Sequence, residues 1–232
     1  MLSMIIGGLQ KLTLLDFPGH TACTLFTVGC NFRCPFCHNA ALVESGSTVE
    51  QIREDTLFRF LEKRRGLLDG VAVTGGEPLL HADLKELLRK IKALGYSVKL
   101  DTNGSFPDRL AEIMESGLAD YVAMDIKSSP AQYAEVAGTG AFTDRVLESI
   151  RLLRTGNVAY EFRTTAVHPF HTVQDFAEIG KLIQGAPRYF IQCFRDSGNI
   201  LKSGCTAPDH KTLHAFLEAV QPYVPSAELR GV

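Results

Sequence analysis

The stretch TACTLFTVGCNFRCPFCHNA, residues 21–40, begins as an apolar and β-branched run and continues into a loop that carries Cys30, Cys34 and Cys37. The 232-residue chain contains six cysteines, so half of them fall within eight consecutive positions. The apolar run predicts a strand of a buried sheet. The sequence therefore places three sulfur donors on a loop directly after the first core strand.

Apolar, β-rich runs and amphipathic helical segments alternate from this loop to the end of the chain. Several strand candidates are nearly continuous in apolar or β-branched residues, as expected when both faces of a parallel sheet are covered. The opening residues predict a further strand or hairpin. The six core candidates span residues 21–28, 70–75, 97–103, 121–127, 160–167 and 188–194.

Apolar side chains at helical spacing predict the helices between these strands. Gly95 and Gly117 follow two of the helices, where a left-handed residue is favourable. Six strands with interleaved helices predict an α/β fold, a partial, open (β/α)6 barrel, in a single domain over residues 1–232. The apolar stripes are Leu84, Leu87, Leu88, Ile91 and Leu94, then Phe176, Ile179, Leu182 and Ile183, and in the last helix, from about Asp209, Leu213, Phe216, Leu217 and Val220.

The composition narrows the class of protein. Hydrophobic residues make up 45% and charged residues 22% of the chain, as in ordinary globular proteins, and the formal net charge of −2 provides no basic field for nucleic acid. No secretory signal and no run of 18 apolar residues is present, so no membrane association is expected. We therefore expect a cytoplasmic protein with reduced thiols, whose clustered cysteines bind metal or react.

Three thiolates suit an iron–sulfur cluster better than a closed zinc site. A structural zinc ion normally takes four ligands, and only His38 lies near enough in the sequence to complete the set. Cys thiolates hold one iron each, so three of them would hold three corners of a 4Fe–4S cube and leave one iron open to a substrate. Phe32 and Phe36 would shield such a cluster from water. A Cys3His zinc site and unligated thiols are the alternatives.

Glycine and polar residues follow the next two strands. Gly75 and Gly76, in VTGGEPLL at 73–80, allow backbone to approach a ligand closely, although Gly-Gly-Glu-Pro is also an ordinary turn sequence. Asp101 and Thr102, in LDTNG at 100–104, end the third strand, and the Asn-Gly pair after them favours a turn. These strand ends are candidates for a ligand site.

Charged residues mark the ends of two later strands. Asp125 and Lys127 occupy alternate positions and so share one side of their strand. Arg163 lies in a strand that is otherwise apolar or small, where a guanidinium needs an anion. A ligand is the preferred partner of Arg163, and an ion pair with Glu161 or a neighbouring strand is the alternative. For Asp125 and Lys127, a simple ion pair without a cofactor role is the alternative.

The motif GCNFRCPFCHN resembles the signature of radical S-adenosylmethionine (SAM) enzymes, and VTGGEPLL follows it as in that family. The opening LTLLDFPGHTACTLFTVGCNFRCPFCHNAALV is similar to the activating proteins of anaerobic ribonucleoside-triphosphate reductase. The resemblance implies a 4Fe–4S cluster on Cys30, Cys34 and Cys37 and SAM as cofactors. It also implies a glycyl radical enzyme as partner and flavodoxin or ferredoxin as electron donor.

The resemblance also implies roles for residues around SAM. The segment Gly75, Gly76 and Glu77 would meet its ammonium group, and Lys127 would pair with its carboxylate. A monovalent cation is implied near Asp101, Thr102 and Asp125. The remaining candidates for the cofactor site are Arg163, His38, Asn39 and His168, with an ordinary strand-end role as the alternative for His168.

The implied activity is reductive cleavage of SAM to a 5′-deoxyadenosyl radical that takes a hydrogen atom from a glycine of the partner enzyme. Two other readings remain open from the sequence. The first is a radical SAM enzyme that modifies a small metabolite or a peptide. The second is a non-catalytic iron–sulfur protein.

Overall fold

A computed structural model describes residues 4–43, 49–140, 143–196, 198 and 200–231. Their strands form one eight-stranded sheet in the sequential order β1 to β8. The first pair is antiparallel and every later pair is parallel. β1 and β8 do not pair with each other, so the barrel is open. The strands are β1 Ile6–Thr13, β2 Ala22–Thr27, β3 Gly70–Gly75, β4 Ser97–Thr102, β5 Tyr121–Asp125, β6 Ala159–Ala166, β7 Tyr189–Cys193 and β8 Ala227–Arg230.

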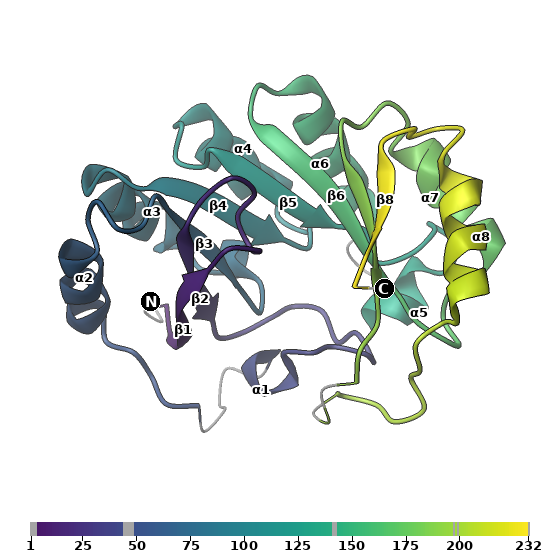
Figure 1. Ribbon diagram of the computed structural model, residues 1–232, viewed down its shortest axis with the longest axis horizontal. Helices are drawn as coiled ribbons and strands as arrows, with labels where there is room; N and C mark the ends of the chain where they lie inside the picture. Colours follow the sequence, from purple (N-terminus) through teal and green to yellow (C-terminus); the bar gives the residue numbers. More distant parts are fainter. Residues whose placement is uncertain (1–3, 44–48, 141–142, 197, 199, 232) are drawn as a thin grey trace.

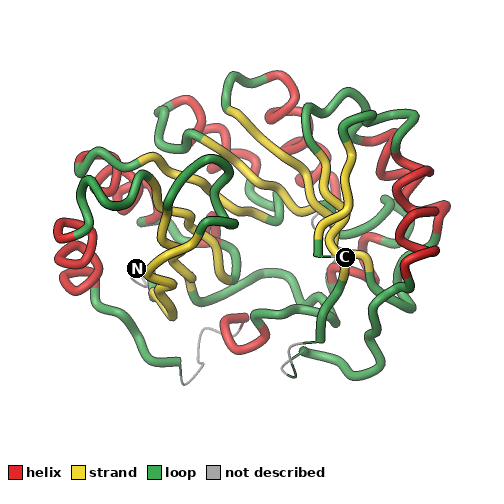
Figure 2. Tube along the Cα trace, in the orientation of Figure 1, coloured by secondary structure: helices red, strands yellow, loops and turns green. Residues whose placement is uncertain are grey.

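Helices follow most of the parallel strands, and the long ones lie on the outer, convex side of the sheet (Figures 1 and 2). The segment between β2 and α1, which holds the three cysteines, crosses the opposite, concave side. The helices are α1 Ala40–Val43, α2 Glu54–Lys63, the 3-10 turn η1 Pro78–Leu80, α3 Leu84–Ala93, α4 Pro107–Glu115, α5 Tyr133–Ala137, α6 Thr143–Thr155, α7 Val173–Leu182 and α8 His210–Val220. Within the described residues, no helix is both long enough and apolar enough to cross a membrane.

Local sequence explains where several helices begin and end. Thr172 and Asp175 form a capping box at the start of α7, in which each side chain accepts a hydrogen bond from the other residue's backbone N–H. Asp209 caps α8 by accepting from the Thr212 N–H at 2.7 Å. Gly95 and Gly117 follow α3 and α4 with φ of 90° and 61°, which confirms the predicted left-handed helix ends.

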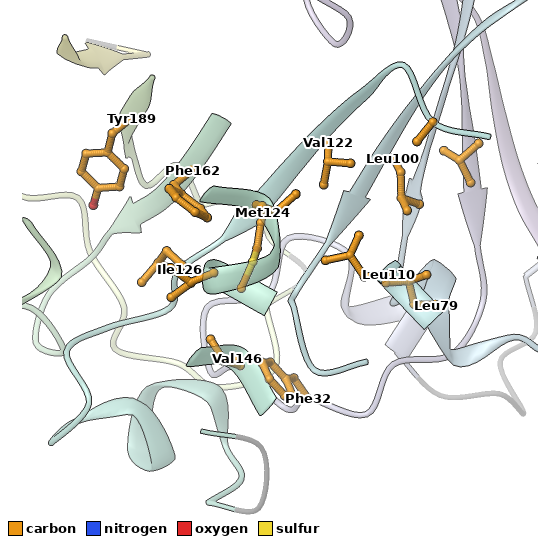
Figure 3. Packing of buried hydrophobic residues seen from close by; sticks show 14 of the residues in the cluster. Phe32, Leu79, Leu100, Leu110, Val122, Met124, Ile126, Val146, Phe162 and Tyr189 are labelled. Carbon is orange, nitrogen blue, oxygen red and sulfur yellow. The ribbon is translucent and has the colours of Figure 1, made fainter. Parts of the chain in front are cut away.

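The apolar core lies between the sheet and its outer helices. Side chains of β4 and β5 such as Leu100, Val122 and Met124 are fully buried there, and Leu110 of α4 and Val146 of α6 pack against the same cluster (Figure 3). Alternate residues of the strands face this core, so the intervening residues face the inside of the barrel.

All six predicted core strands are present and form β2 to β7, which confirms the expected α/β fold with an open barrel. β1 pairs in antiparallel orientation with β2 and extends the sheet, as the predicted strand or hairpin of the opening residues. The sequence did not predict β8, whose four residues include Glu228 and Arg230 and lack an apolar run. This strand forms because Ala227 to Arg230 align in parallel with β7, a pairing that no local pattern encodes.

Candidate functional site

A cavity of about 400 Å³ opens on the inside of the barrel at the carboxyl ends of the strands. In parallel sheets, ligands bind at this edge. All of the predicted site residues line the cavity except Glu77 and His168. The predicted residues that it brings together are Cys30, Cys34, Cys37, His38, Asn39, Gly75, Gly76, Asp101, Thr102, Asp125, Lys127 and Arg163.

Backbone hydrogen bonds hold the cysteine loop against the rest of the site. The Cys30 N–H donates to the Val43 carbonyl of α1 at 3.1 Å, and the Arg33 N–H donates to the Ala137 carbonyl of α5 at 2.9 Å. The Cys37 N–H donates to the Cys34 carbonyl at 3.1 Å and closes a tight turn. These bonds hold the loop against α1 and α5.

The loop also buries Cys34 and partly shields Cys30 and Cys37 from water. Cys34 is 7% exposed, and the two phenylalanines beside the cysteines, Phe32 and Phe36, are 2% and 4% exposed. Burial raises the pKa of the Cys30 thiol to about 12, and the Glu77 carboxylate adds to that shift. Burial also raises the pKa of Cys34 to about 11, against the opposing effect of Lys127. Burial thus disfavours the free thiolates of Cys30 and Cys34, and a bound metal would favour them.

The positions of the donors are relevant to the choice between one metal ion and a cluster. Across the described ranges, no three His, Cys, Asp or Glu side chains are arranged to hold a single metal ion. The described residues include Cys30, Cys34, Cys37 and His38, so this holds for the candidate Cys3His set as well. Thiolates that each bind a different iron stand farther apart than ligands of one ion. Three cysteine sulfurs on one cavity wall fit three irons of a cluster.

Gly75 and Gly76 allow β3 to end against the cysteine loop. A Cβ on Gly75, whose φ is 120°, would lie 2.2 Å from the Thr27 nitrogen, and one on Gly76 would lie 2.1 Å from the Gly29 oxygen. Asn39 donates its side-chain amide to the Gly75 carbonyl at 3.1 Å. Glycine is therefore required by the close approach of two loops of the same chain, in addition to its place on the cavity wall.

Glu77 lies behind the cavity wall and is 0% exposed. Its carboxylate accepts hydrogen bonds from the Thr102 hydroxyl at 2.8 Å, the Asn103 N–H at 2.6 Å and the Leu79 N–H at 3.0 Å. Burial raises the pKa of Glu77 to about 7, although these donors lower it. The structure thus uses Glu77 to join the loop after β3 to the end of β4, a role that the sequence did not suggest.

Five charged side chains form a network across β4, β5 and β6. Arg163 donates from Nε to Asp125 Oδ1 at 3.0 Å and from Nη1 to Asp101 Oδ2 at 3.2 Å. Lys127 pairs with Asp125 Oδ2 at 3.0 Å, and Lys99 pairs with Asp101 Oδ1. The expected Asp125–Lys127 pair is present. Three cations against two anions leave the network with one positive charge in excess.

The alternative considered for Arg163, an ion pair with a neighbouring strand, is present. Arg163 lines the cavity, but its guanidinium already pairs with the carboxylates of two neighbouring strands. Glu161, the other partner considered, instead accepts from the Tyr121 hydroxyl at 2.9 Å and pairs with Arg230 at 3.3 Å.

The network controls the charge of its members. Burial alone would raise the pKa of Asp125, but Arg163 and Lys127 lower it to about 2. For Asp101, burial acts in the same direction, and Arg163 and Lys99 outweigh it, so the pKa lies below the usual value. Both carboxyl groups are therefore ionised at neutral pH.

The remaining candidates, His38, Asn39 and His168, differ in their positions and contacts. His38 stacks on Phe194 with ring centroids 5.3 Å apart and lies at the mouth of the cavity. Asn39 acts through its bond to the Gly75 carbonyl. His168 lies outside the cavity, where its backbone exchanges hydrogen bonds with Thr206 at 2.9 and 3.1 Å. The structure therefore places His168 in the support of a loop, which was the alternative reading.

Several cavity residues escaped the sequence analysis. The side-chain nitrogen of Asn103 lies 3.9 Å from the Cys30 sulfur and donates to the side-chain oxygen Oδ1 of Asn31 at 3.0 Å. Thr165 and Gln192 line the cavity from the ends of β6 and β7. Thr165 follows Arg163 by two positions, so strand alternation was a signal that could have found it. Asn103 gave no such signal, because Asn-Gly also reads as a turn.

A second cavity of about 420 Å³ lies at the open edge of the barrel and shares wall residues with the first. His38, Thr165 and Gln192 line both cavities. Arg195 and Arg230 add positive charge to the outer cavity, and Asp196 adds one negative charge. The two cavities are therefore adjacent and share a wall.

Comparison with known proteins agrees with this site. The Radical SAM superfamily matches residues 24–183, and the chain belongs to this family. A protein of Methanocaldococcus jannaschii, named as a glycyl-radical enzyme activating enzyme, is 33% identical over 98% of this chain and 96% of its own length. A GTP 3',8-cyclase of Halobacterium salinarum is 34% identical over 52% of this chain but only 35% of its own length.

Solved structures share the fold at low sequence identity. A domain of pyruvate-formate lyase-activating enzyme from Bacteroides vulgatus has a TM-score of 0.55 and 16% identity, with 70% of this chain and 99% of that one covered. Streptococcus suis SuiB, bound to its precursor peptide SuiA, has a TM-score of 0.67 and 16% identity, with 87% and 46% covered. Family membership implies a 4Fe–4S cluster and SAM as cofactors, and the three thiols on the cavity wall fit that cluster.

Proposed function

We propose that this protein activates a glycyl radical enzyme, with anaerobic ribonucleoside-triphosphate reductase as the intended partner. The observation that carries the proposal is the match to a glycyl-radical enzyme activating relative along 98% of the chain, at 33% identity. The cyclase relatives match only about half of the chain, which favours the activating role over a small-molecule reaction. A low-potential protein such as flavodoxin or ferredoxin is the proposed electron donor.

When bound, the reduced cluster supplies the electron that splits SAM into methionine and a 5′-deoxyadenosyl radical, which removes a hydrogen atom from the partner's glycine. Cys30, Cys34 and Cys37 are the proposed cluster ligands. The loop that carries them is held by α1 and α5, so the three sulfur atoms keep their positions on the cavity wall. Pre-positioned ligands lower the cost of binding.

The charged network is the proposed site for the anionic end of SAM. Its excess positive charge favours a carboxylate, and Lys127, which is 20% exposed, is the cation best placed to meet one. The Gly75 and Gly76 backbone lies across the cavity from β5 and β6 and contributes carbonyl groups for an ammonium group. Ligand binding would thus balance the charge of the buried network.

The second cavity is the proposed entry of the partner's glycine segment. It opens to solvent beside β8, an edge strand among the described residues, and joins the first cavity at Thr165 and Gln192. A polypeptide segment can follow such an edge in extended form. A partner segment seated in this cavity would displace water near a reactive radical.

The proposal is tested by anaerobic reconstitution with iron and sulfide, followed by reduction in the presence of SAM. We expect 5′-deoxyadenosine to form, and a glycyl doublet to appear by electron paramagnetic resonance when the candidate reductase is added. Cys34→Ala should abolish both signals while the protein stays folded. Cys205→Ser is the matched control, because Cys205 lies in the loop before α8 and should leave iron content unchanged.

The possible outcomes separate the readings. 5′-Deoxyadenosine without a glycyl signal on any glycyl radical enzyme would overturn the activating role and favour a small-molecule or peptide substrate. No 5′-deoxyadenosine from a protein with a full complement of iron would overturn radical SAM activity itself. Full cleavage by Cys34→Ala would overturn the ligand assignment.

A further inference from the structure

The family resemblance implies a monovalent cation near Asp101, Thr102 and Asp125, and the structure allows the fit of these donors to be tested. A hard cation binds through oxygen atoms that are free to face it. Each of the four carboxylate oxygens of the two aspartates already meets a cationic side chain: Lys99 and Arg163 at Asp101, and Arg163 and Lys127 at Asp125. The two carboxylates therefore have their positive partners within the chain.

The third expected donor, the Thr102 hydroxyl, already makes hydrogen bonds within the chain. The Thr102 hydroxyl donates to Glu77 at 2.8 Å and accepts from the Gly104 N–H at 3.1 Å. Thr102 is only 3% exposed, so these two bonds hold its oxygen toward the loop after β3. Its oxygen is thus committed to holding the loops together.

The net charge of the five-residue network also disfavours an added cation. Lys99, Lys127 and Arg163 carry three positive charges and Asp101 and Asp125 carry two negative charges, an excess of one. Lys99 is 1% exposed and Arg163 is 13% exposed, so water screens them weakly. A guanidinium also keeps its charge at any physiological pH. An added metal ion would raise the excess to two and would be repelled by the buried cations.

The strand register explains how one side chain reaches both aspartates. Arg163 of β6 is the direct neighbour of Asp125 of β5, and Asp101 of β4 is the direct neighbour of Ala123. Ala123 shares the inner face with Asp125, and its methyl group leaves room for the guanidinium to extend across β5. The planar fork of arginine can then donate to two carboxylates at once.

We propose that Arg163 takes the place of a monovalent cation between Asp101 and Asp125, so that this protein binds SAM without sodium or potassium. The guanidinium separates two carboxylates that would otherwise repel each other. Arg163 is thus a positioning residue, acting through the two aspartates and Lys127. The inference depends on the SAM site and is independent of the identity of the partner enzyme.

The first arm of the test uses the reconstituted protein without oxygen. SAM affinity is measured by titration calorimetry, and the thermal unfolding midpoint is measured in parallel, in potassium, sodium or tetramethylammonium chloride at equal ionic strength. Tetramethylammonium is too large to enter a site between two carboxylates. We expect the wild-type Kd for SAM to change by less than about twofold among the three salts, since no site for a small cation is free.

The second arm removes the guanidinium. Arg163→Met leaves the two aspartates without their shared partner, and we expect SAM binding to weaken about tenfold in tetramethylammonium and to recover largely in potassium or sodium. The unfolding midpoint should rise with potassium in this variant only. Adding Asp101→Asn to Arg163→Met should abolish the acquired response, because one carboxylate no longer attracts the ion.

Two comparisons keep the test decisive. Arg151→Met removes an exposed arginine that pairs with a single carboxylate, Glu148, and should acquire no cation response. If Arg163→Met does not fold, Arg163→Gln carries the same test, because a neutral amide also leaves the two carboxylates without their shared cation. A wild-type Kd that improves about tenfold with potassium, or an Arg163 variant that folds and ignores potassium, would overturn the proposal.

Discussion

The two faces of the sheet differ sharply, although each strand contributes to both. On the outer face, alternate residues of the central strands are aliphatic or Met and 0% exposed, and they pack against the helices. On the inner face, the positions between them carry Lys99, Asp101, Asp125 and Arg163, with small residues such as Ala123 beside them. The outer residues are Val71, Val73, Val98, Leu100, Val122 and Met124.

Adjacent residues of one strand thus serve different purposes, one contributing to stability and the next to ligand binding. Leu100 contributes apolar burial, and Asp101, its neighbour, contributes charge to the cavity. Small inner side chains leave the volume that becomes the cavity. Substitutions on the outer face should therefore change the free energy of unfolding, and substitutions on the inner face should change SAM binding or activation of the partner.

The largest loss of stability is expected on the outer face. Leu100→Ala removes a fully buried side chain between β4 and its helices and should lower the free energy of unfolding by about 2–5 kcal/mol. Denaturant unfolding measures this change, and SAM affinity under folding conditions should stay close to that of the wild type. A loss of SAM binding comparable to the loss of stability would contradict the division of the faces.

The free energy of unfolding should depend on pH through Glu77, which is buried behind the cavity wall. Its folded pKa of about 7 exceeds the ordinary value near 4.5, so the folded state binds the proton more tightly. Its stabilising contribution is complete below about pH 4.5 and is lost as the pH rises through about 7, by up to about 3 kcal/mol.

The measurement compares wild type with Glu77→Gln from pH 5 to pH 8. The amide of the variant must turn an N–H toward a backbone donor, so we expect a loss of about 1–3 kcal/mol of unfolding free energy. The stability difference between the two proteins should shrink as the pH rises. A difference that grows with pH would show that the Glu77 carboxylate is ionised in the folded protein throughout this range.

Gln192→Met tests the inner face where the two cavities meet. The side chain is partly exposed and near-isosteric with methionine, so the free energy of unfolding should change by less than about 1 kcal/mol. Activation of the partner should fall by about tenfold while SAM cleavage without the partner persists, since the change lies on the entry path. Equal losses in both reactions would place Gln192 at SAM instead of at the entry.

The smallest effect is expected far from both faces. Leu15 lies in the turn between β1 and β2 and is 88% exposed. Leu15→Ser should change the free energy of unfolding by no more than about 0.5 kcal/mol and leave SAM affinity unchanged. Calorimetric unfolding checks the first value, and a larger loss would reveal a packing role for this turn.

Sequence patterns predicted the elements whose signals are local. The run at 21–28 and the five later apolar runs became β2 to β7, and the spacing of the leucines around Leu88 predicted α3. β8 was missed because its residues resemble an exposed loop until β7 lies beside them. His168 was a candidate by its place at a strand end, but the chain turns it to pair with Thr206.

The sequence by itself determined the trio of cysteines, the order of strands and helices, and which charged residues stand at strand ends. Only the tertiary structure decided which charges meet. Arg163 finds Asp125 38 residues away and Asp101 62 residues away in the chain. Periodicity fixes the face on which a side chain lies, whereas its partner depends on the register of strands that are distant in sequence. Burial then makes each such pairing obligatory, because an unpaired charge in that position would be costly.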